Sequence, residues 1–211
     1  MLITLGVLLV QIGMIGGFIS SLRGTLRRKN LQLNQAMERI SNMAVRDELT
    51  GIYNRRRLIE VLQGEVARAA RGDAQFSICL FDLDYFKQIN DKRGHPIGDR
   101  VLSDCAAAVE GLIRNVDTFG RFGGEEFLLI MPMTNADAAS IAANRLRKRI
   151  AALKFIDDEG DPFEVTVSIG VATSAADAAH ETNAILRRAD KALYAAKAAG
   201  RNCVKLADSA C

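Results

Sequence analysis

Histidine, cysteine and tryptophan are scarce in this chain, and their scarcity limits the chemistry available to it. The 211 residues include two histidines, four cysteines and no tryptophan. His95 and His180 have no cysteine or second histidine nearby, which argues against a zinc site or a nucleophilic triad. The cysteines show no metal-ligand spacing. Because Cys79 and Cys105 stand among apolar or small residues, we expect buried, free thiols in a reducing compartment.

A strong excess of charge of either sign is also missing. The formal net charge is +3, and no basic stripe with interleaved aromatic residues occurs. Nucleic acid is therefore not an expected partner. Hydrophobic residues make up 49% of the chain, which is enough for a core, and the length suits one domain with an appendage.

Charged residues are absent from the stretch at 2–22. A helix of this length would span ~30 Å, the thickness of a bilayer core. Basic residues begin at Arg23, and such residues favour the cytoplasmic side. The pattern predicts a transmembrane helix over 1–22 and a single-pass inner-membrane protein whose remaining residues are cytoplasmic. A cleaved signal peptide and a buried soluble helix are the alternatives.

The stretch after this segment carries an apolar repeat. Leu26, Leu33 and Ile40 are spaced by seven residues, which predicts a short parallel coiled-coil stalk over 23–46. A single amphipathic linker helix is the alternative.

A domain is expected at 47–206, followed by a tail at 207–211. Its apolar pattern alternates between helical and strand periods, and Asn54 is a suitable N-cap for the first helix. Helices packed on a sheet that contains an antiparallel hairpin give an α+β fold. We expect helices over 55–71, 97–114, 135–153 and 183–199, and strands over 76–83, 163–172 and 203–206.

Two adjacent glycines followed by two acids separate a pair of strand-like runs. A Gly-Gly pair between strands predicts a tight hairpin turn, with positive φ at both Gly123 and Gly124. Glu125 and Glu126 then stand at the tip. Adjacent carboxylates have little role in packing at such a place, so they are expected to face water, a cation or a ligand that carries one.

A second acidic group ends the apolar strand at 76–83. Asp82 and Asp84 are two residues apart and therefore point to the same side of the strand. A carboxylate in this position is costly unless it is paired or bound to a metal. Asp82 together with an acid of the hairpin would suit Mg²⁺, which prefers hard oxygen ligands and leaves room for water and phosphates.

These acids belong to an ordered series of motifs. In chain order they are Asp47-Glu48-Leu49-Thr50-Gly51 with Asn54-Arg55-Arg56, Phe81-Asp82-Leu83-Asp84-Tyr85-Phe86-Lys87-Gln88-Ile89-Asn90-Asp91, Gly94-His95-Pro96-Ile97-Gly98-Asp99, Gly123-Gly124-Glu125-Glu126-Phe127, and Ala189-Asp190-Lys191-Ala192-Leu193-Tyr194 through Gly200-Arg201-Asn202. The series resembles the GGDEF-domain diguanylate cyclases, which make cyclic di-GMP from two GTP. The resemblance implies a five-stranded central sheet flanked by helices. It also implies a homodimer in which two domains face each other.

The resemblance assigns roles to individual residues. The implied residues are Asp82, Glu125 and the Leu83 carbonyl for Mg²⁺ (or Mn²⁺), Glu126 as a further catalytic acid, Asn90 and Asp99 for guanine, and Phe86, Lys87, Lys197 and Arg201 for the phosphates. A carboxylate accepts from the N1–H and the exocyclic amine of guanine, whereas adenine cannot satisfy it. Purely structural alternatives are that Asn90 and Asp99 lie at helix starts and that the two cations favour a helix dipole.

A second site is implied upstream of the hairpin. Arg114 and Asp117 fit the family's R-x-x-D pattern, and Arg145 matches a further arginine that some members use there. The resemblance implies an inhibitory site for cyclic di-GMP, whose guanine edges and phosphates suit the planar fork of arginine. A helix-end arginine beside a strand-flanking acid is the alternative.

The expected activity is therefore that of a product-inhibited diguanylate cyclase. A non-catalytic receptor for GTP or cyclic di-GMP is the alternative from another functional class. Degenerate members of the family typically lose the hairpin acids or glycines, and none is lost here.

Overall fold

The chain divides into two compact units, Met1–Ala44 and Val45–Cys211. The predicted segment at 1–22 lies outside the described residues, as does most of the predicted stalk at 23–46. The computed structural model describes residues 23, 27, 29, 45–72, 75–174 and 181–207.

The predicted location in the inner membrane is corrected by the helices of the described residues. None of these helices is long and apolar enough to cross a membrane. The longest of those with printed bounds, α6 (Thr182–Ala198), has 17 residues, whereas a membrane-spanning helix needs about 20 apolar residues. A single-pass membrane protein is therefore not supported.

The second unit alternates helices and strands. Asn54 caps the first helix, as predicted, by accepting from the main-chain N–H of Arg57 at 3.1 Å. In chain order the elements are α2 (Arg55–Ala70), β1 (Phe76–Leu83), α3 (Phe86–Arg93), α4 (His95–Glu110), β2 (Thr118–Arg121), β3 (Glu126–Pro132), α5 (Ala136–Ala151), β4 (Phe155–Ile156), β5 (Pro162–Phe163), β6 (Val167–Thr173), α6 (Thr182–Ala198) and β7 (Val204–Leu206).

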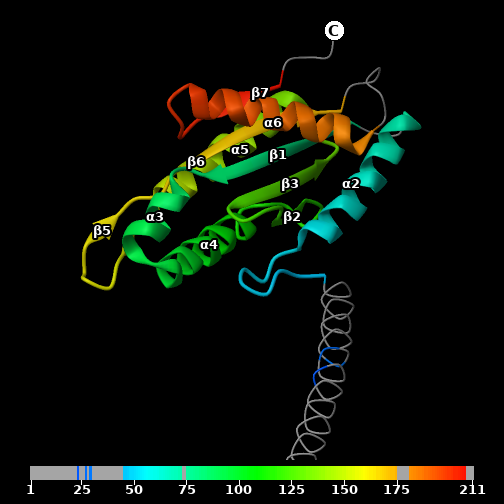
Figure 1. The fold of residues 1–211 in the computed structure, drawn as a ribbon. Coiled ribbons are helices and arrows are strands. Elements are labelled where there is room, and N and C mark those ends of the chain that lie inside the picture. The colour runs from blue at the N-terminus through cyan, green and yellow to red at the C-terminus, as the bar shows by residue number, and fades with distance from the viewer. Residues whose placement is uncertain are drawn as a thin grey trace, which may run out of the picture. The chain divides into compact units, whose positions relative to one another are not determined.

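A mixed five-stranded sheet forms the centre of this unit, with strand order β2-β3-β1-β6-β7 (Figure 1). β1 pairs antiparallel with both β3 and β6, β2 pairs antiparallel with β3, and β6 pairs parallel with β7. The two short strands β4 and β5 form a separate hairpin. The predicted α+β fold with a five-stranded central sheet is confirmed.

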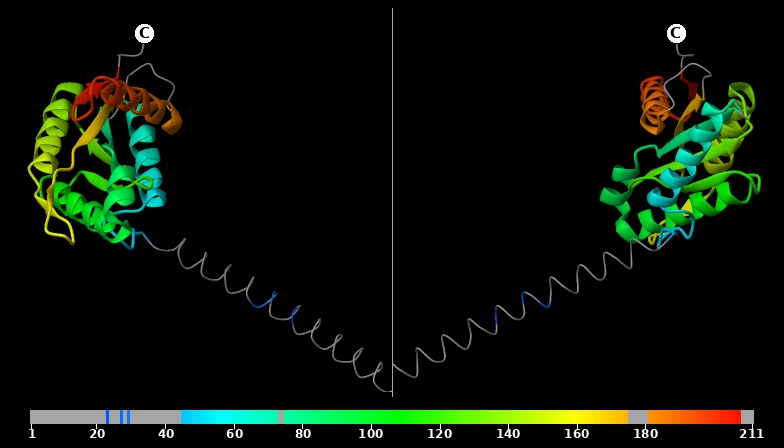
Figure 2. Two further views of the ribbon diagram at one scale, coloured as in Figure 1. Left: turned by 60° about the vertical axis from the view of Figure 1, so that its left-hand side comes forward. Right: turned by 90° about the vertical axis from the view of Figure 1, so that its right-hand side faces the viewer.

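Helices cover both faces of the sheet (Figure 2). Alternate residues of β1 enter different cores, since successive side chains of a strand point to opposite faces. Cys79, Phe81 and Leu83 pack with α4 and α5, whereas Ile78 and Leu80 pack with α2 and α6. All eight residues of β1 are buried, so a polar side chain at its end requires a partner.

Most predicted elements are confirmed to within a few residues, but two features differ. The 163–172 run is two strands, because β5 pairs with β4 while β6 begins at Val167 opposite Leu83. The eight-residue helix α3 was not predicted. Arg93 fixes its last turn, forming an ion pair with Asp157 and lying 4.3 Å from the ring centroid of Phe163.

Candidate active site

The site forms where β1 ends beside the start of β3. Asp82 lies opposite Glu126 in the antiparallel register, and the main-chain N–H of Leu83 donates to the carbonyl of Glu125 at 3.4 Å. Antiparallel pairing thus joins the two acidic groups, which stand some forty residues apart in the sequence. Asp82 is 6% exposed, and both hairpin acids are half-buried.

The hairpin turn differs from the predicted one, because neither glycine has a positive φ. Residues 122–125 form a wider turn, closed by the N–H groups of Phe122 and Gly123 donating to the carbonyl of Glu126 at 2.8 and 3.2 Å. Gly123 instead lies close to the side chain of Glu126, which a larger residue would displace. A Cβ there would lie 2.5 Å from Oε2 of Glu126.

Arg121 stabilises this turn, a role that the sequence analysis missed. Its guanidinium donates to the carbonyls of Gly123 and Gly124, the latter at 2.7 Å, and to the carboxylate of Asp47 at 3.3 Å. The five donors of an arginine, spread over a planar fork, allow one side chain to bind both the tip and the start of the domain. The spacing of Arg121 two residues before the glycines was its only sequence signal.

The carboxylates at this site repel one another. Burial raises the pKa of Asp82, and the ammonium of Lys197, whose Nζ lies 2.7 Å from Oδ2 of Asp82, opposes that rise. Burial, then repulsion from Asp82, raises the pKa of both Glu125 and Glu126. In the charged state the cluster is therefore destabilised by its own charge, and a bound cation would remove that cost.

The oxygen ligands at this site would suit a magnesium ion whose remaining ligands are water and phosphate oxygens. Among the described residues, no group of three His, Cys, Asp or Glu side chains is placed to hold a metal. Asp82, Glu125 and the Leu83 carbonyl supply two charged oxygens and one neutral one. Mg²⁺ usually takes one or two carboxylates and completes its shell with water and phosphates, so a nucleotide would be needed to complete the site.

Asp84 is a structural anchor that the sequence analysis did not identify. It is 4% exposed and accepts from the hydroxyls of Thr166 and Ser168, both at 2.7 Å, and from the main-chain N–H of Asn202 at 3.0 Å. Arg201 and Asn202 have φ values of 63° and 43°, which is costly for residues with a Cβ. Asp84 therefore holds the strained turn that carries Arg201.

Replacing Asp84 by alanine should lower the free energy of unfolding by about 3 kcal/mol, because three donors lose a charged acceptor. Urea denaturation measures this change. Asp158→Ala, at an exposed position in the β4–β5 turn, serves as the control and should change stability by less than about 0.5 kcal/mol. Equal stability of the two variants would contradict the anchoring role.

The first turn of α3 supplies main-chain donors. Its N-cap residue, Tyr85, has a left-handed φ of 59° and makes no side-chain cap within the described residues. The N–H groups of Phe86 and Lys87 therefore point out of the helix start, where an anion is favourable. Arg201 reaches the same turn: it donates to the Tyr85 hydroxyl at 3.2 Å, and its guanidinium lies 4.4 Å from that ring's centroid.

The two predicted guanine contacts lie on consecutive helices. Asn90 is on α3 and the exposed Asp99 is on α4. Oδ1 of Asn90 is buried and has no hydrogen-bond partner in the described part of the chain. A buried acceptor without a donor is unfavourable, so a ligand that donates a hydrogen bond to Oδ1 of Asn90 would remove this cost.

Arg114 and Asp117 are brought together away from the acidic cluster. Arg114 donates from its main-chain N–H to Asp117 at 2.9 Å and from Nη2 at 2.7 Å, and the same nitrogen donates to Oγ1 of Thr134 at 2.7 Å. These contacts to Asp117 raise the pKa of Arg114. Arg145 lies near this turn, since its Nη2 donates to the carbonyl of Leu112 at 2.9 Å.

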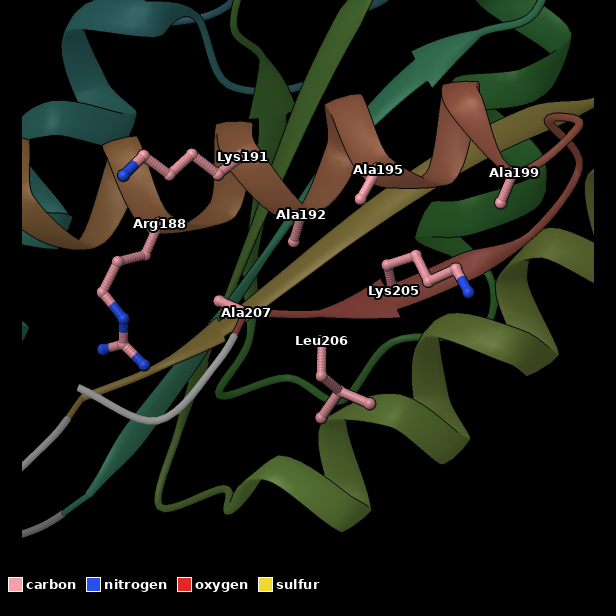
Figure 3. A pocket seen from close by; sticks show the side chains of 8 residues that line it. All are labelled: Arg188, Lys191, Ala192, Ala195, Ala199, Lys205, Leu206 and Ala207. Atoms are coloured by element: carbon pink, nitrogen blue, oxygen red, sulfur yellow. The ribbon is translucent and has the colours of Figure 1, made fainter. Parts of the chain in front are cut away.

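A groove of about 620 Å³ lies elsewhere, between α6 and β7. Figure 3 shows Ala192, Ala195 and Ala199 on the side of α6 that faces β7, with Lys205 on the strand. Arg188, at one end, donates to the carbonyl of Thr173 at 2.8 Å. None of the residues lining this groove is a predicted site residue, so it is separate from the acidic cluster.

The acidic hairpin, its partner Asp82 and the helices around them match a known family. Residues 44–203 match the family described as "Diguanylate cyclase, GGDEF domain". The chain belongs to the GGDEF-domain diguanylate cyclase family. The sequence-based assignment is thereby confirmed.

Curated members of the GGDEF family share much of this sequence. The chain is 40% identical over 173 residues to "Response regulator PleD" of Caulobacter vibrioides, covering 82% of this chain and 38% of the relative. It is 42% identical over 164 residues to "Diguanylate cyclase DgcP" of Pseudomonas aeruginosa, covering 78% of this chain and 24% of the relative. The chain thus spans less than half the length of these two relatives.

A solved GGDEF structure shares the fold. The GGDEF domain of DgcB from Caulobacter crescentus, crystallised in complex with c-di-GMP, superposes with a TM-score of 0.75 at 30% identity. The match covers 79% of this chain and 97% of that domain. Nearly the whole of the crystallised domain therefore has a counterpart here.

Proposed function

We propose that this chain is a diguanylate cyclase that condenses two GTP into cyclic di-GMP and two pyrophosphates. Each 3′-oxygen forms a bond to the α-phosphorus of the other GTP, and the bond from that phosphorus to the β-phosphate oxygen breaks. Each 3′-hydroxyl loses its proton in the process. The observation that carries the proposal is the meeting of Asp82, Glu125 and Glu126 beside Lys197, where β1 ends and β3 begins.

Different groups of the chain would bind different parts of one GTP. The α3 N–H groups of Phe86 and Lys87, with Arg201, would hold the terminal phosphates. Lys197 would move from Asp82 to the phosphates as the nucleotide arrives, since a lysine side chain is long and flexible. GGDEF cyclases generally use a divalent metal, and Mg²⁺ bound at Asp82, Glu125 and the Leu83 carbonyl would neutralise phosphate charge and acidify the attacking hydroxyl.

Two copies of the chain are needed under this proposal. One domain presents a single set of acids and a single α3 start, and so it binds one GTP. The reaction joins two GTP, and each must be presented to the other in line. Activity per molecule should therefore rise with protein concentration until the dimer is saturated.

Release of pyrophosphate from GTP tests the activity against the receptor alternative. The enzyme should release pyrophosphate with GTP and Mg²⁺, and a chelator should stop it. A protein at micromolar concentration that binds GTP without releasing pyrophosphate would be a receptor instead.

We also propose that Arg114, Asp117 and Arg145 bind the product and restrain catalysis. The c-di-GMP complex of the related DgcB domain supports product binding by this fold. Arg114→Ala should raise the concentration of cyclic di-GMP needed for half-inhibition by about tenfold or more, because a forked arginine contact is lost. Arg149 is exposed on the same helix as Arg145, so Arg149→Ala is the control. Cyclic di-GMP should inhibit this variant at the same concentration as the parent. Unchanged inhibition of Arg114→Ala would place product control elsewhere.

A further inference from the structure

Helices α3 and α4 approach each other closely at one glycine. Gly94 joins the two helices and has a φ of 83°. Gly98, one turn into α4, is buried against α3. A Cβ at position 98 would lie 1.9 Å from Oδ1 of Asn90, 3.0 Å from its Cγ and 3.2 Å from Cζ of Phe86. A Cβ essentially never lies within 3.0 Å of another non-bonded heavy atom, so Asn90 would have to move.

The Asn90 oxygen in this contact is a hydrogen-bond acceptor that is unsatisfied among the described residues. Oδ1 of Asn90 is buried and has no hydrogen-bond partner within the described residues. It can accept from an N–H group. Guanine carries such a group in its exocyclic amine, and hypoxanthine, which is otherwise the same base, lacks it.

We propose that Gly98 is a specificity-determining positioning residue: its lack of a side chain lets Asn90 hold its amide oxygen where the exocyclic amine of guanine donates. The inference rests on the proposed function, in which Asn90 contacts the base of GTP. Gly98 itself touches no substrate. It acts through Asn90, and it directly precedes Asp99, the other predicted guanine contact.

A purely structural role for Gly98 predicts a different outcome. If Gly98 only allowed close helix packing, a larger residue would weaken the binding of every purine nucleotide equally. Displacement of Phe86, at the phosphate end of α3, would also act on all nucleotides alike. Displacement of the Asn90 oxygen affects guanine more than hypoxanthine. Displacement of the neighbouring Asp99, which can also accept from the exocyclic amine, would do the same, so the ratio of the two affinities is interpreted together with the Asn90→Ala background.

The test compares Gly98→Ala with the parent protein by calorimetry. The ligands are 3′-deoxy-GTP and 3′-deoxy-ITP, which lack the attacking hydroxyl and are not turned over. The parent should bind the guanine nucleotide more tightly. Gly98→Ala should weaken its binding about tenfold more than that of the hypoxanthine nucleotide. Equal weakening of both, no weakening of either, or a parent that does not distinguish them would overturn the inference.

Two further variants separate the effect on Asn90 from an effect on folding. Gly64→Ala lies in α2, where a Cβ meets nothing within 4 Å among the described residues, and it should bind both nucleotides like the parent. In an Asn90→Ala background, Gly98→Ala should no longer change the affinity ratio. If Gly98→Ala alone fails to fold, trimming Asn90 should restore folding; failure of the double variant where Asn90→Ala folds would contradict the contact.

The outcome is independent of turnover. A parent that makes cyclic di-GMP, with an unchanged affinity ratio in Gly98→Ala, would refute only the role of Gly98. A parent that makes no product, with the expected change in ratio, would refute only the cyclase activity.

Discussion

Replacing Glu125 by glutamine is expected to lower the rate of cyclic di-GMP formation on the order of 10²–10³-fold, the usual cost of losing one group that stabilises transition-state charge. The substitution nearly keeps the size and shape of the side chain, removes its charge and replaces one carboxylate oxygen by an NH₂ donor. Its main-chain carbonyl can still accept from Leu83. The rate constant kcat measured with GTP and Mg²⁺ gives the effect.

Stability distinguishes loss of a metal ligand from loss of the fold. Burial and the charge of Asp82 raise the pKa of Glu125, so the neutral variant should be at least as stable as the parent without divalent ions. Mg²⁺ with GTP should then raise the Tm of the parent more than that of Glu125→Gln. Glu159→Gln, in the exposed β4–β5 turn, should behave like the parent. If kcat of Glu125→Gln stays within about threefold of the parent value, Glu125 is not a catalytic residue.

Asp99→Asn is expected to lower kcat/KM for GTP by about 10–100-fold and to narrow the preference for GTP over ATP, since a bidentate base contact is worth about 1–3 kcal/mol. The asparagine amide presents a donor where the carboxylate accepts from guanine N1–H. The N1 of adenine is an acceptor and can pair with this donor, so ATP is no longer excluded.

Parallel assays with GTP and ATP measure this change in preference. Asp104→Asn, at an exposed position five residues further along α4, is a matched control and should preserve both values. An unchanged ratio of GTP to ATP in Asp99→Asn would mean that another residue reads the base.

Local sequence signals located the main elements well. β1 has the bounds that its apolar run predicted, and its alternate residues enter different cores, as a two-residue period requires. Helix α3 was missed because it is short and polar, and because its N-cap, Tyr85, gives no capping signal in the sequence. The break between β5 and β6 was missed because alternating apolar residues continue through residues 164–166, which belong to neither strand, and only the pairing with β4 separates β5 from β6.

Interactions between distant segments account for the remaining differences. The sequence predicted only that Asp84 points to the same side as Asp82, whereas its hydrogen-bond donors come from residues 166, 168 and 202. Positive φ was predicted at the hairpin glycines, whereas the structure shows no positive φ there and places Gly123 close to the side chain of Glu126. The contact of Gly98 with Asn90 depends on how two helices cross. Such distances are properties of the packed structure and leave no local pattern in the sequence.

Product identity and stoichiometry test the proposed activity most directly. The protein is incubated with GTP and Mg²⁺ over a range of protein concentrations, and nucleotides and pyrophosphate are quantified by chromatography and mass spectrometry. We predict cyclic di-GMP as the product, two pyrophosphates for each molecule formed, and a specific activity that rises with protein concentration. Bound GTP that stays intact at every concentration, or one pyrophosphate released with a cyclic mononucleotide, would contradict it.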